Sequence, residues 1–366
     1  MIVTVTPNPA LDLTWHVARL VPGGTHRADA GRSRAGGKGL NVARVAHAQG
    51  ADVHAVTTAG GATGEELLRE LRGSGVPHTV VPVAAPTRRS VAVVDEHAGD
   101  TTIVNEHGIA PTAAEWRDLH AAVDIALAAA APGGAAPAAQ AIPAGPVLPA
   151  GQALPAGAVV PAGAASARPV LVVAGSVPPG SPDDAIAALV ARGRAAGAAV
   201  IADTSGPALL RAAEAGASVL KPNAAELAEA TGIESPVDGA RELLRRGAGL
   251  VLLSLGPAGM LAVSADGVVG ARLAEPLSGN PTGAGDAAVA ACAVLMAEGE
   301  HDPETILRRA TSWSAAAVLM PLAGEVHESW PGLEAALLVE RAPLTERASK
   351  ERASNERASN ERKEQR

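Results

Sequence analysis

Short apolar runs alternate along this chain with longer segments in which apolar residues recur at helical spacing. The runs predict strands over 2–6, 53–57, 170–174, 199–202, 219–220 and 250–253. The longer segments predict helices over 35–46, 65–72, 112–130, 182–196, 207–215, 284–297 and 303–319. Such alternation predicts an α/β fold with a mostly parallel sheet and helices on both faces.

Several shorter strands fall outside this alternation. We expect strands over 13–17 and 27–32, a hairpin over 91–94 and 101–105, and a second hairpin over about 260–272. The first two are expected to lie outside the main sheet.

Two segments differ in composition from the rest. Over 132–167, Pro-Ala-Gly recurs with a period of six at Pro143, Pro149, Pro155 and Pro161. A hexapeptide β-helix is one interpretation, but turns of Ala, Pro and Gly would bury no core, so a disordered insertion is predicted. The tail 345–366 repeats Glu-Arg-Ala-Ser and is expected to be solvated or a fraying helix. One folded domain over 1–344, interrupted by the insertion, remains.

Composition and charge exclude several classes of function. The formal net charge is −8 with no basic block in the body, which argues against nucleic acid and anionic membranes as partners. Cys292 is the one cysteine, so a disulfide framework and a cysteine metal site are excluded. There is no charged leader and no apolar run of membrane-spanning length, so we expect a cytoplasmic protein.

The segment Asn280-Pro281-Thr282-Gly283-Ala284-Gly285-Asp286 carries the first chemical signal. It predicts a tight turn that opens an apolar helix, where backbone N–H groups stabilise an anion. A carboxylate beside such an anion hole suits phosphoryl transfer. In an isolated motif the commoner interpretation is an Asp that only complements the helix dipole.

A second glycine-rich turn, Gly36-Gly37-Lys38-Gly39, opens the helix that contains Asn41. It is not a Walker A loop, because no Ser or Thr follows the lysine. After the first strand, where a dinucleotide-binding fold has its glycines, this chain has Pro7, Pro9 and Asp12. This argues against a nucleotide-dependent oxidoreductase.

Polar residues follow successive predicted strands. They are Ser176, Asp203, Asn223 with Glu226, Ser254 and Asp286. Ligands bind at this edge of open α/β sheets, so a site is expected there.

Together these motifs, with Thr6-Pro7-Asn8-Pro9-Ala10-Leu11-Asp12 and Gly175-Ser176-Val177-Pro178-Pro179-Gly180, resemble the PfkB (ribokinase-like) carbohydrate kinases. The branch most similar is that of 1-phosphofructokinase and tagatose-6-phosphate kinase. The resemblance implies a ribokinase-like three-layer α-β-α sandwich. It also implies a small β-sheet lid, with strands near 13–32 and 88–106, that pairs two subunits in a homodimer.

The resemblance further implies a kinase that uses ATP and Mg²⁺. Asp286 is expected to be the catalytic base, with an anion hole at Gly283, Ala284 and Gly285. Substrate-binding residues are expected to be Asp12, Gly37, Asn41 and Ser176 for the sugar, with Lys38, Arg88 and Arg27 at a phosphate already on it. Nucleotide-binding residues are expected to be Lys221, Asn223, Glu226, Ser254, Gly256 and Thr282. Asn223 and Glu226 are expected to hold Mg²⁺ through water.

The predicted acceptor is a phosphorylated ketohexose, with fructose 1-phosphate first, tagatose 6-phosphate second and fructose 6-phosphate third. A kinase for free hexoses and a non-catalytic sugar-phosphate sensor are the alternatives. Each residue also has a plainer interpretation. Asn223 and Glu226 form a helix-capping pair, Lys38 and Arg88 are solvated charges, and Asp12 caps a turn.

Overall fold

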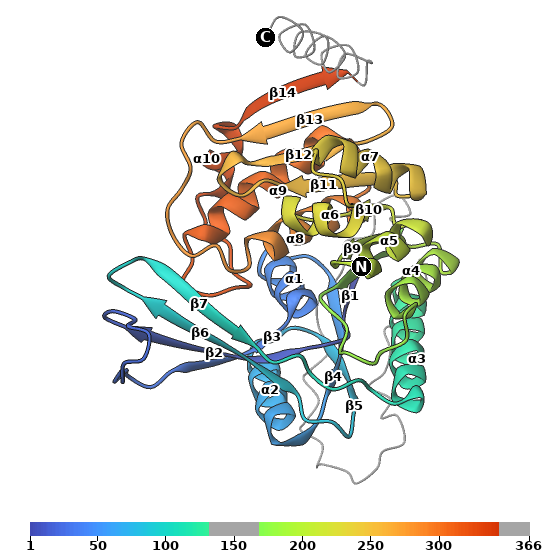
Figure 1. The fold of residues 1–366 in the computed structure, drawn as a ribbon. Helices are drawn as coiled ribbons and strands as arrows, with labels where there is room; N and C mark the ends of the chain where they lie inside the picture. The colour runs from blue at the N-terminus through green and yellow to red at the C-terminus, as the bar shows by residue number, and fades with distance from the viewer. Residues whose placement is uncertain (132–167, 344–366) are drawn as a thin grey trace, which may run out of the picture.

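The computed structural model describes residues 1–131 and 168–343, and it contains a large and a small β-sheet. Figure 1 shows the small sheet projecting to one side of the layered body. The predictions for the insertion 132–167 and the tail 345–366 lie outside the described residues. Within the described ranges, no helix has the length and apolar character needed to cross a membrane.

Within the described residues, the main sheet has ten strands. Seven are parallel and lie in the order β5 (His78–Pro82), β4 (Val53–Ala59), β1 (Ile2–Thr6), β8 (Val170–Ala174), β9 (Ala199–Asp203), β10 (Val219–Leu220) and β11 (Leu250–Ser254). Three antiparallel strands extend it beyond β11, namely β12 (Met260–Val263), β13 (Gly267–Arg272) and β14 (Leu338–Pro343). The carboxyl ends of the parallel strands therefore meet at one edge, as predicted.

Successive side chains of the central strands enter two separate cores. In β8, Val170 and Val172 belong to one core, whereas Leu171 and Val173 belong to the other. The first core is covered by α1 (Lys38–Ala48), α2 (Gly61–Gly73), α8 (Ala284–Ala297), α9 (Pro303–Val318) and α10 (Trp330–Ala335). The second is covered by α3 (Ala113–Ala130), α4 (Ala185–Ala195), α5 (Pro207–Glu214), α6 (Ala224–Thr231) and α7 (Pro236–Arg246). The predicted three layers are confirmed.

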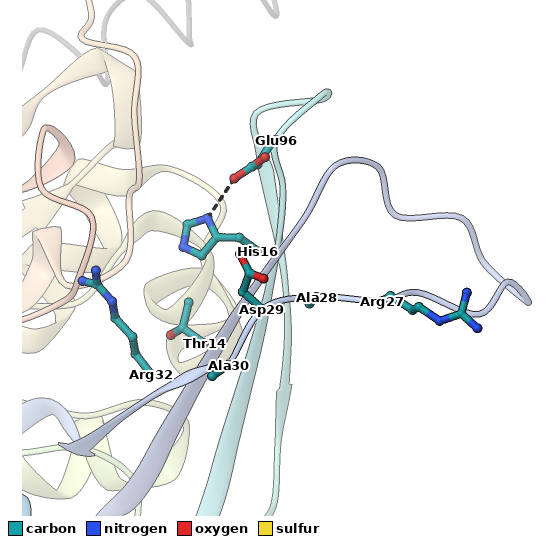
Figure 2. A pocket seen from close by; sticks show the side chains of 8 residues that line it. All are labelled: Thr14, His16, Arg27, Ala28, Asp29, Ala30, Arg32 and Glu96. Carbon is teal, nitrogen blue, oxygen red and sulfur yellow. Dashed lines mark ion pairs between the residues drawn. The ribbon is translucent and has the colours of Figure 1, made fainter.

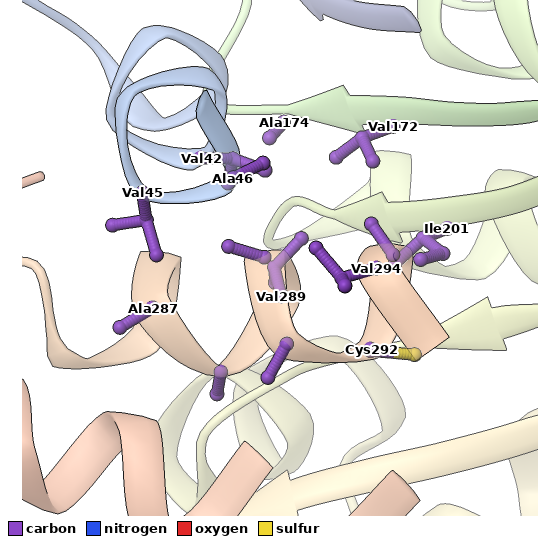
Figure 3. Packing of buried hydrophobic residues seen from close by; sticks show 14 of the residues in the cluster. Val42, Val45, Ala46, Val172, Ala174, Ile201, Ala287, Val289, Cys292 and Val294 are labelled. Carbon is purple, nitrogen blue, oxygen red and sulfur yellow. The ribbon is translucent and has the colours of Figure 1, made fainter. Parts of the chain in front are cut away.

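Helix α8 is buried on nearly all sides, because every residue from Asp286 to Met296 is buried. Figure 3 shows α8 beside α1, with Val294 on the side of the strands that carry Val172 and Ile201. Its many alanines let these neighbours approach closely. The first turn of α8, which carries Asp286, is therefore fixed in position by the core.

The small sheet, called here the lid sheet, has the order β3 (Arg32–Gly36), β2 (Ala10–Val17), β6 (Arg88–Asp95) and β7 (Asp100–Asn105). Asp12 in β2 pairs with Arg34 on one side and with Ser90 on the other. Because paired residues share a face of a sheet, this register gathers polar and charged groups around Asp12.

Some predicted boundaries are wrong. The strand expected over 27–32 begins only at Arg32, and the residues before it form a loop. Helix α2 begins at Gly61 rather than at residue 65. The elements β5, α7, α10 and β14 had no counterpart in the prediction. Thr112 and Asn223, in contrast, cap α3 and α6 with complete capping boxes.

Candidate active site

Asp286 lies in the first turn of α8 with its side chain almost fully buried, at 7% exposure. The side-chain amide of Asn41 donates to Asp286 Oδ2 at 2.8 Å. Burial raises the pKa of Asp286 to about 7, and the negative charge of Asp203 adds to the effect, while Lys38 and Lys221 oppose it. A carboxyl group with a pKa near neutrality suits a general base.

The start of α8 has the form expected of an anion hole. Gly283 is its N-cap residue with φ of +85°, and no side chain caps the helix. A Cβ on Gly283 would lie 2.8 Å from the Cα of Ala323, so the site requires glycine. The N–H of Ala284 donates to Pro281 O at 3.2 Å, so this predicted anion-hole amide already has a partner. The dipole of the helix and its first-turn N–H groups still favour an anion there.

Two lysines converge on one buried carboxylate beside Asp286. Lys38 Nζ lies 3.0 Å and Lys221 Nζ lies 3.5 Å from Asp203 Oδ1 at the end of β9. Burial opposes ionisation of Asp203, but Lys221 and Lys38 bring its pKa below the usual value. Lys38 Nζ also lies 3.8 Å from Glu226 Oε1. We call Asp286, Lys38, Lys221, Asp203 and Glu226 the phosphoryl cluster.

Lys221 also contacts the helix start, because a Cβ on Gly285 would lie 3.2 Å from its ammonium nitrogen. Asp203 was among the polar residues expected at this edge of the sheet, but it was given no specific role. Its position after a buried strand was the available signal, but the sequence does not show that two lysines meet it.

Asn223 and Glu226 form the predicted capping pair. Asn223 Oδ1 accepts from the Glu226 N–H at 2.8 Å, and Glu226 Oε2 accepts from the Asn223 N–H at 2.9 Å. Among the described residues, no three His, Cys, Asp or Glu side chains are placed to hold a metal ion directly. Glu226 is partly exposed, at 21%, so it fits a hydrated Mg²⁺ held through water better than direct coordination.

A second group of charges surrounds Asp12 on the lid sheet. Burial raises the pKa of Asp12 to about 6, against the opposing effects of Arg88, Arg34 and Arg44. The carboxylate lies directly against Gly36, where a Cβ would be 2.0 Å from Asp12 Oδ2. Gly37, the N-cap residue of α1, has φ of +113°. We call Asp12, Arg34, Arg44, Arg88 and Ser176 the acceptor cluster.

Arg88 and Ser176 are joined to this cluster through Asn8. Arg88 Nε and Nη2 donate to the backbone oxygen of Asn8 at 3.3 and 3.2 Å. The side-chain amide of Asn8 donates to Ser176 Oγ at 3.1 Å. The structure thus brings these two predicted substrate residues together.

The other predicted cations lie elsewhere. Lys38 belongs to the phosphoryl cluster, and neither Lys38 nor Arg27 is among the charges that act on Asp12. Arg27 lies on the exposed loop before β3, at a cavity of about 480 Å³ that Thr14 and Arg32 also line. Figure 2 shows its side chain directed away from these two residues. Of the three cations, Arg88 alone lies in the acceptor cluster.

The remaining predicted nucleotide residues follow the same edge of the sheet. Ser254 ends β11, pairs with Asn223 and donates its N–H to Pro222 O at 3.1 Å. Gly256, with φ of +59°, begins the short 3₁₀ turn Gly256–Ala258. The N–H of Thr282 donates to Asn280 Oδ1 at 3.0 Å. Their roles toward a nucleotide stay a prediction.

The two clusters meet at α1. Asn41 contacts Asp286, while Gly36 just before α1 lies against the Asp12 carboxylate and Arg44 within α1 acts on its charge. A hydroxyl compound held between Asp12 and Asp286 would have the buried carboxyl group of Asp286 beside it, and an anion transferred to it would have a helix start and two ammonium groups nearby. This arrangement can carry out phosphoryl transfer to an alcohol.

Comparison with known proteins agrees with this geometry. Residues 6–131 and 152–329 match the model of the pfkB family carbohydrate kinases. The chain is 34% identical over 324 residues to a 1-phosphofructokinase of Xanthomonas campestris pv. campestris, covering 85% of this chain and 89% of the relative. It is 31% identical over 304 residues to an ATP-dependent 6-phosphofructokinase isozyme 2 of Mycobacterium tuberculosis, covering 81% and 78%.

Solved structures show the same fold. The phosphofructokinase-2 of Escherichia coli in complex with fructose-6-phosphate is similar with a TM-score of 0.73 and 28% identity, covering 91% of this chain and 98% of that chain. A ribokinase of Arabidopsis thaliana, at 21% identity, is similar with a TM-score of 0.63. The predicted ribokinase-like fold is confirmed. The chain belongs to the pfkB family of carbohydrate kinases and is a phosphotransferase with an alcohol group as acceptor.

Proposed function

We propose that this enzyme transfers the γ-phosphoryl group of ATP to a hydroxyl of a phosphorylated ketohexose, with fructose 1-phosphate as the first candidate. The observation that carries the proposal is that Asn8 links Arg88 and Ser176 through hydrogen bonds, and that Arg88 acts on the buried carboxyl group of Asp12. A sugar hydroxyl suits Asp12, whereas an arginine and a serine hydroxyl suit a phosphate.

Asp286 takes the proton of the attacking hydroxyl in this proposal. Burial raises the pKa of Asp286 to about 7, and the side-chain amide of Asn41 orients one of its carboxylate oxygens. The start of α8 stabilises charge on the transferred group. Lys38 and Lys221 contribute positive charge on the same side, so Lys38 serves the transferred phosphoryl group rather than the phosphate of the sugar.

ATP and Mg²⁺ complete the proposed site. The residues that would lie along the ATP are Lys221, Ser254, Gly256 and Thr282. Hydrated Mg²⁺ would be held through water by Asn223 and Glu226. When bound, the ion neutralises charge on the nucleotide phosphates. The partly exposed Glu226 carboxylate supports this role.

The names of the relatives support a sugar phosphate over a free sugar. One relative is named a 1-phosphofructokinase and another a 6-phosphofructokinase. The first shares slightly more identity, which keeps fructose 1-phosphate ahead of tagatose 6-phosphate and fructose 6-phosphate.

A substrate panel tests the proposal. ATP consumption is measured with the three ketohexose phosphates and with free fructose and tagatose. We expect at least one phosphate to give a kcat/KM well above that of both free sugars. Higher values for a free sugar would establish a simple hexose kinase, and no turnover with any sugar would establish a sensor.

We also propose that two subunits pair through the lid sheet. The described part of the lid region exposes large apolar side chains, with Ile103 at 44%, Val104 at 62% and Ile109 at 61%. Val104→Asp should convert a dimer to a monomer in light scattering, whereas Ile125→Asp on α3, also exposed, should not. A wild-type monomer at micromolar concentration would contradict this pairing.

A further inference from the structure

Asn8 is a buried polar residue, 7% exposed, that stands between Pro7 and Pro9 directly after β1. A following proline restricts a residue to extended backbone, so the position of the Asn8 carbonyl is stiff. Gly108 closes the other side, because its Cβ would lie 2.5 Å from Asn8 Oδ1. The side chain is thus held from both sides.

The amide nitrogen of Asn8 has two hydrogen-bond partners. It donates to His107 O at 3.0 Å and to Ser176 Oγ at 3.1 Å. Since an amide nitrogen only donates, Ser176 Oγ must be the acceptor in the second bond. The hydroxyl proton of Ser176 is consequently left to donate to another group.

The backbone oxygen of Asn8 orients Arg88. It accepts from Nε and Nη2, and Arg88 Nη1 donates to Glu106 O at 3.1 Å. A guanidinium has five N–H groups, so these three bonds fix its plane and leave two for a ligand. Asn8 therefore orients two hydrogen-bond donors, the neutral hydroxyl of Ser176 and the charged guanidinium of Arg88.

We propose that Asn8 is a positioning residue that turns the Ser176 hydroxyl and the Arg88 guanidinium toward a phosphate group on the acceptor. It thereby sets the preference for a phosphorylated over a free sugar. This inference rests on the proposed function and adds to it the residue that organises the phosphate end of the site.

Steady-state kinetics of Asn8→Ala and Asn8→Asp give the first test. Loss of one hydrogen bond that orients a donor is expected to raise KM for fructose 1-phosphate about tenfold in Asn8→Ala. Asn8→Asp keeps the shape of the side chain, but the carboxylate cannot donate to Ser176 and repels a phosphate. KM for fructose 1-phosphate should therefore rise more in Asn8→Asp than in Asn8→Ala. KM for ATP and kcat should stay within about twofold. Gln49→Ala, which removes an exposed amide at the end of α1, is the control and should change nothing.

A double-mutant cycle with Ser176→Ala separates positioning from a general structural role. The Asn8 side chain acts through Ser176, so Asn8→Ala should add less than about twofold to KM in the Ser176→Ala background. If Asn8→Ala raises KM for fructose 1-phosphate tenfold in both the wild-type and the Ser176→Ala backgrounds, the inference is overturned. An equal rise of KM for fructose 1-phosphate and free fructose would also overturn it.

Binding of inorganic phosphate, measured by calorimetry without any sugar and with ATP present to occupy the anion site at the start of α8, distinguishes this inference from the proposed function. We expect binding to the wild type that is lost in Asn8→Asp and kept in Gln49→Ala. A wild type that phosphorylates free sugars alone would defeat the proposed function. Unchanged phosphate binding in Asn8→Asp, or none in the wild type, would defeat the role of Asn8.

Discussion

Burial suits Asp286 to the role of general base that we propose for it. An exposed aspartate is fully ionised at pH 7 and a weak base, whereas burial raises the pKa of Asp286 to about 7. The ionised form must accept the proton, so kcat/KM should rise with pH and level above about 7. Asp286→Asn cannot accept it and should lose roughly 10²–10⁴ in kcat while ATP and sugar still bind. A variant that keeps more than about a tenth of the wild-type kcat would show that another group is the base.

Asp203 contributes to that pKa through its charge. Its carboxylate raises the pKa of Asp286 and pairs with two lysines that lower it. In Asp203→Asn the negative charge is lost and both ammonium groups lose a partner, and both changes favour ionised Asp286. The acidic limb of the pH–rate profile should therefore move to lower pH. A limb that stays in place or moves to higher pH would contradict this coupling.

Single residues were predictable where a short motif carries the chemistry. Asp286 and its glycines follow from one segment, and the Asn223–Glu226 capping pair follows from its spacing. Asp203 and Lys38 lie 165 positions apart, so no local pattern reveals that they pair. The assignment of Lys38 to the phosphate of the sugar was made without knowledge of this partner, and it stays a prediction.

At the scale of elements, the turn into α8 depends on glycine at its N-cap. Gly283→Ala should place a methyl group against Ala323 and strain a backbone with φ of +85°. Gly299→Ala is the matched control, since Gly299 has φ of +90° but nothing within 4 Å of its Cβ position. Both variants should lose stability by thermal denaturation, but only Gly283→Ala should lower kcat, by about tenfold or more. An equal kcat in the two variants would mean that the helix start is not the anion hole.

Elements were predictable where periodicity and caps agree. The limits of α8 match the prediction because an apolar run begins at a glycine turn and ends at polar residues. Strand β3, in contrast, reads Arg-Ser-Arg-Ala-Gly and carries no apolar alternation. It is a strand because it pairs with β2, and this pairing places Arg34 opposite Asp12. Such tertiary contacts override local propensity.

For the whole molecule, the order of strands places the site. Because β1, β8, β9, β10 and β11 are parallel, the segments that follow them meet at one edge, and this much was predictable from the alternation of strands and helices. The division of that edge into an acceptor cluster and a phosphoryl cluster was not predictable from the sequence. It depends on where α1 crosses between the lid sheet and α8, which is set by packing.

We propose that the acceptor cluster recognises a phosphate on the sugar through Arg88. Charge-assisted hydrogen bonds contribute about 1.5–3 kcal/mol, so Arg88→Ala should reduce kcat/KM for a phosphorylated ketohexose about tenfold to a hundredfold, mainly through KM. Its effect on free fructose should be small. Arg89→Ala is the matched control, because Arg89 is exposed and its neighbours along β6 face the other way.

The most direct measurement is therefore kcat/KM for fructose 1-phosphate and for free fructose, in the wild type, Arg88→Ala and Arg89→Ala. We expect the wild type and Arg89→Ala to prefer the phosphate strongly, and Arg88→Ala to lose most of that preference. If Arg88→Ala lowers kcat/KM equally for both substrates, or if the wild type prefers free fructose, the acceptor cluster does not recognise a phosphate through Arg88.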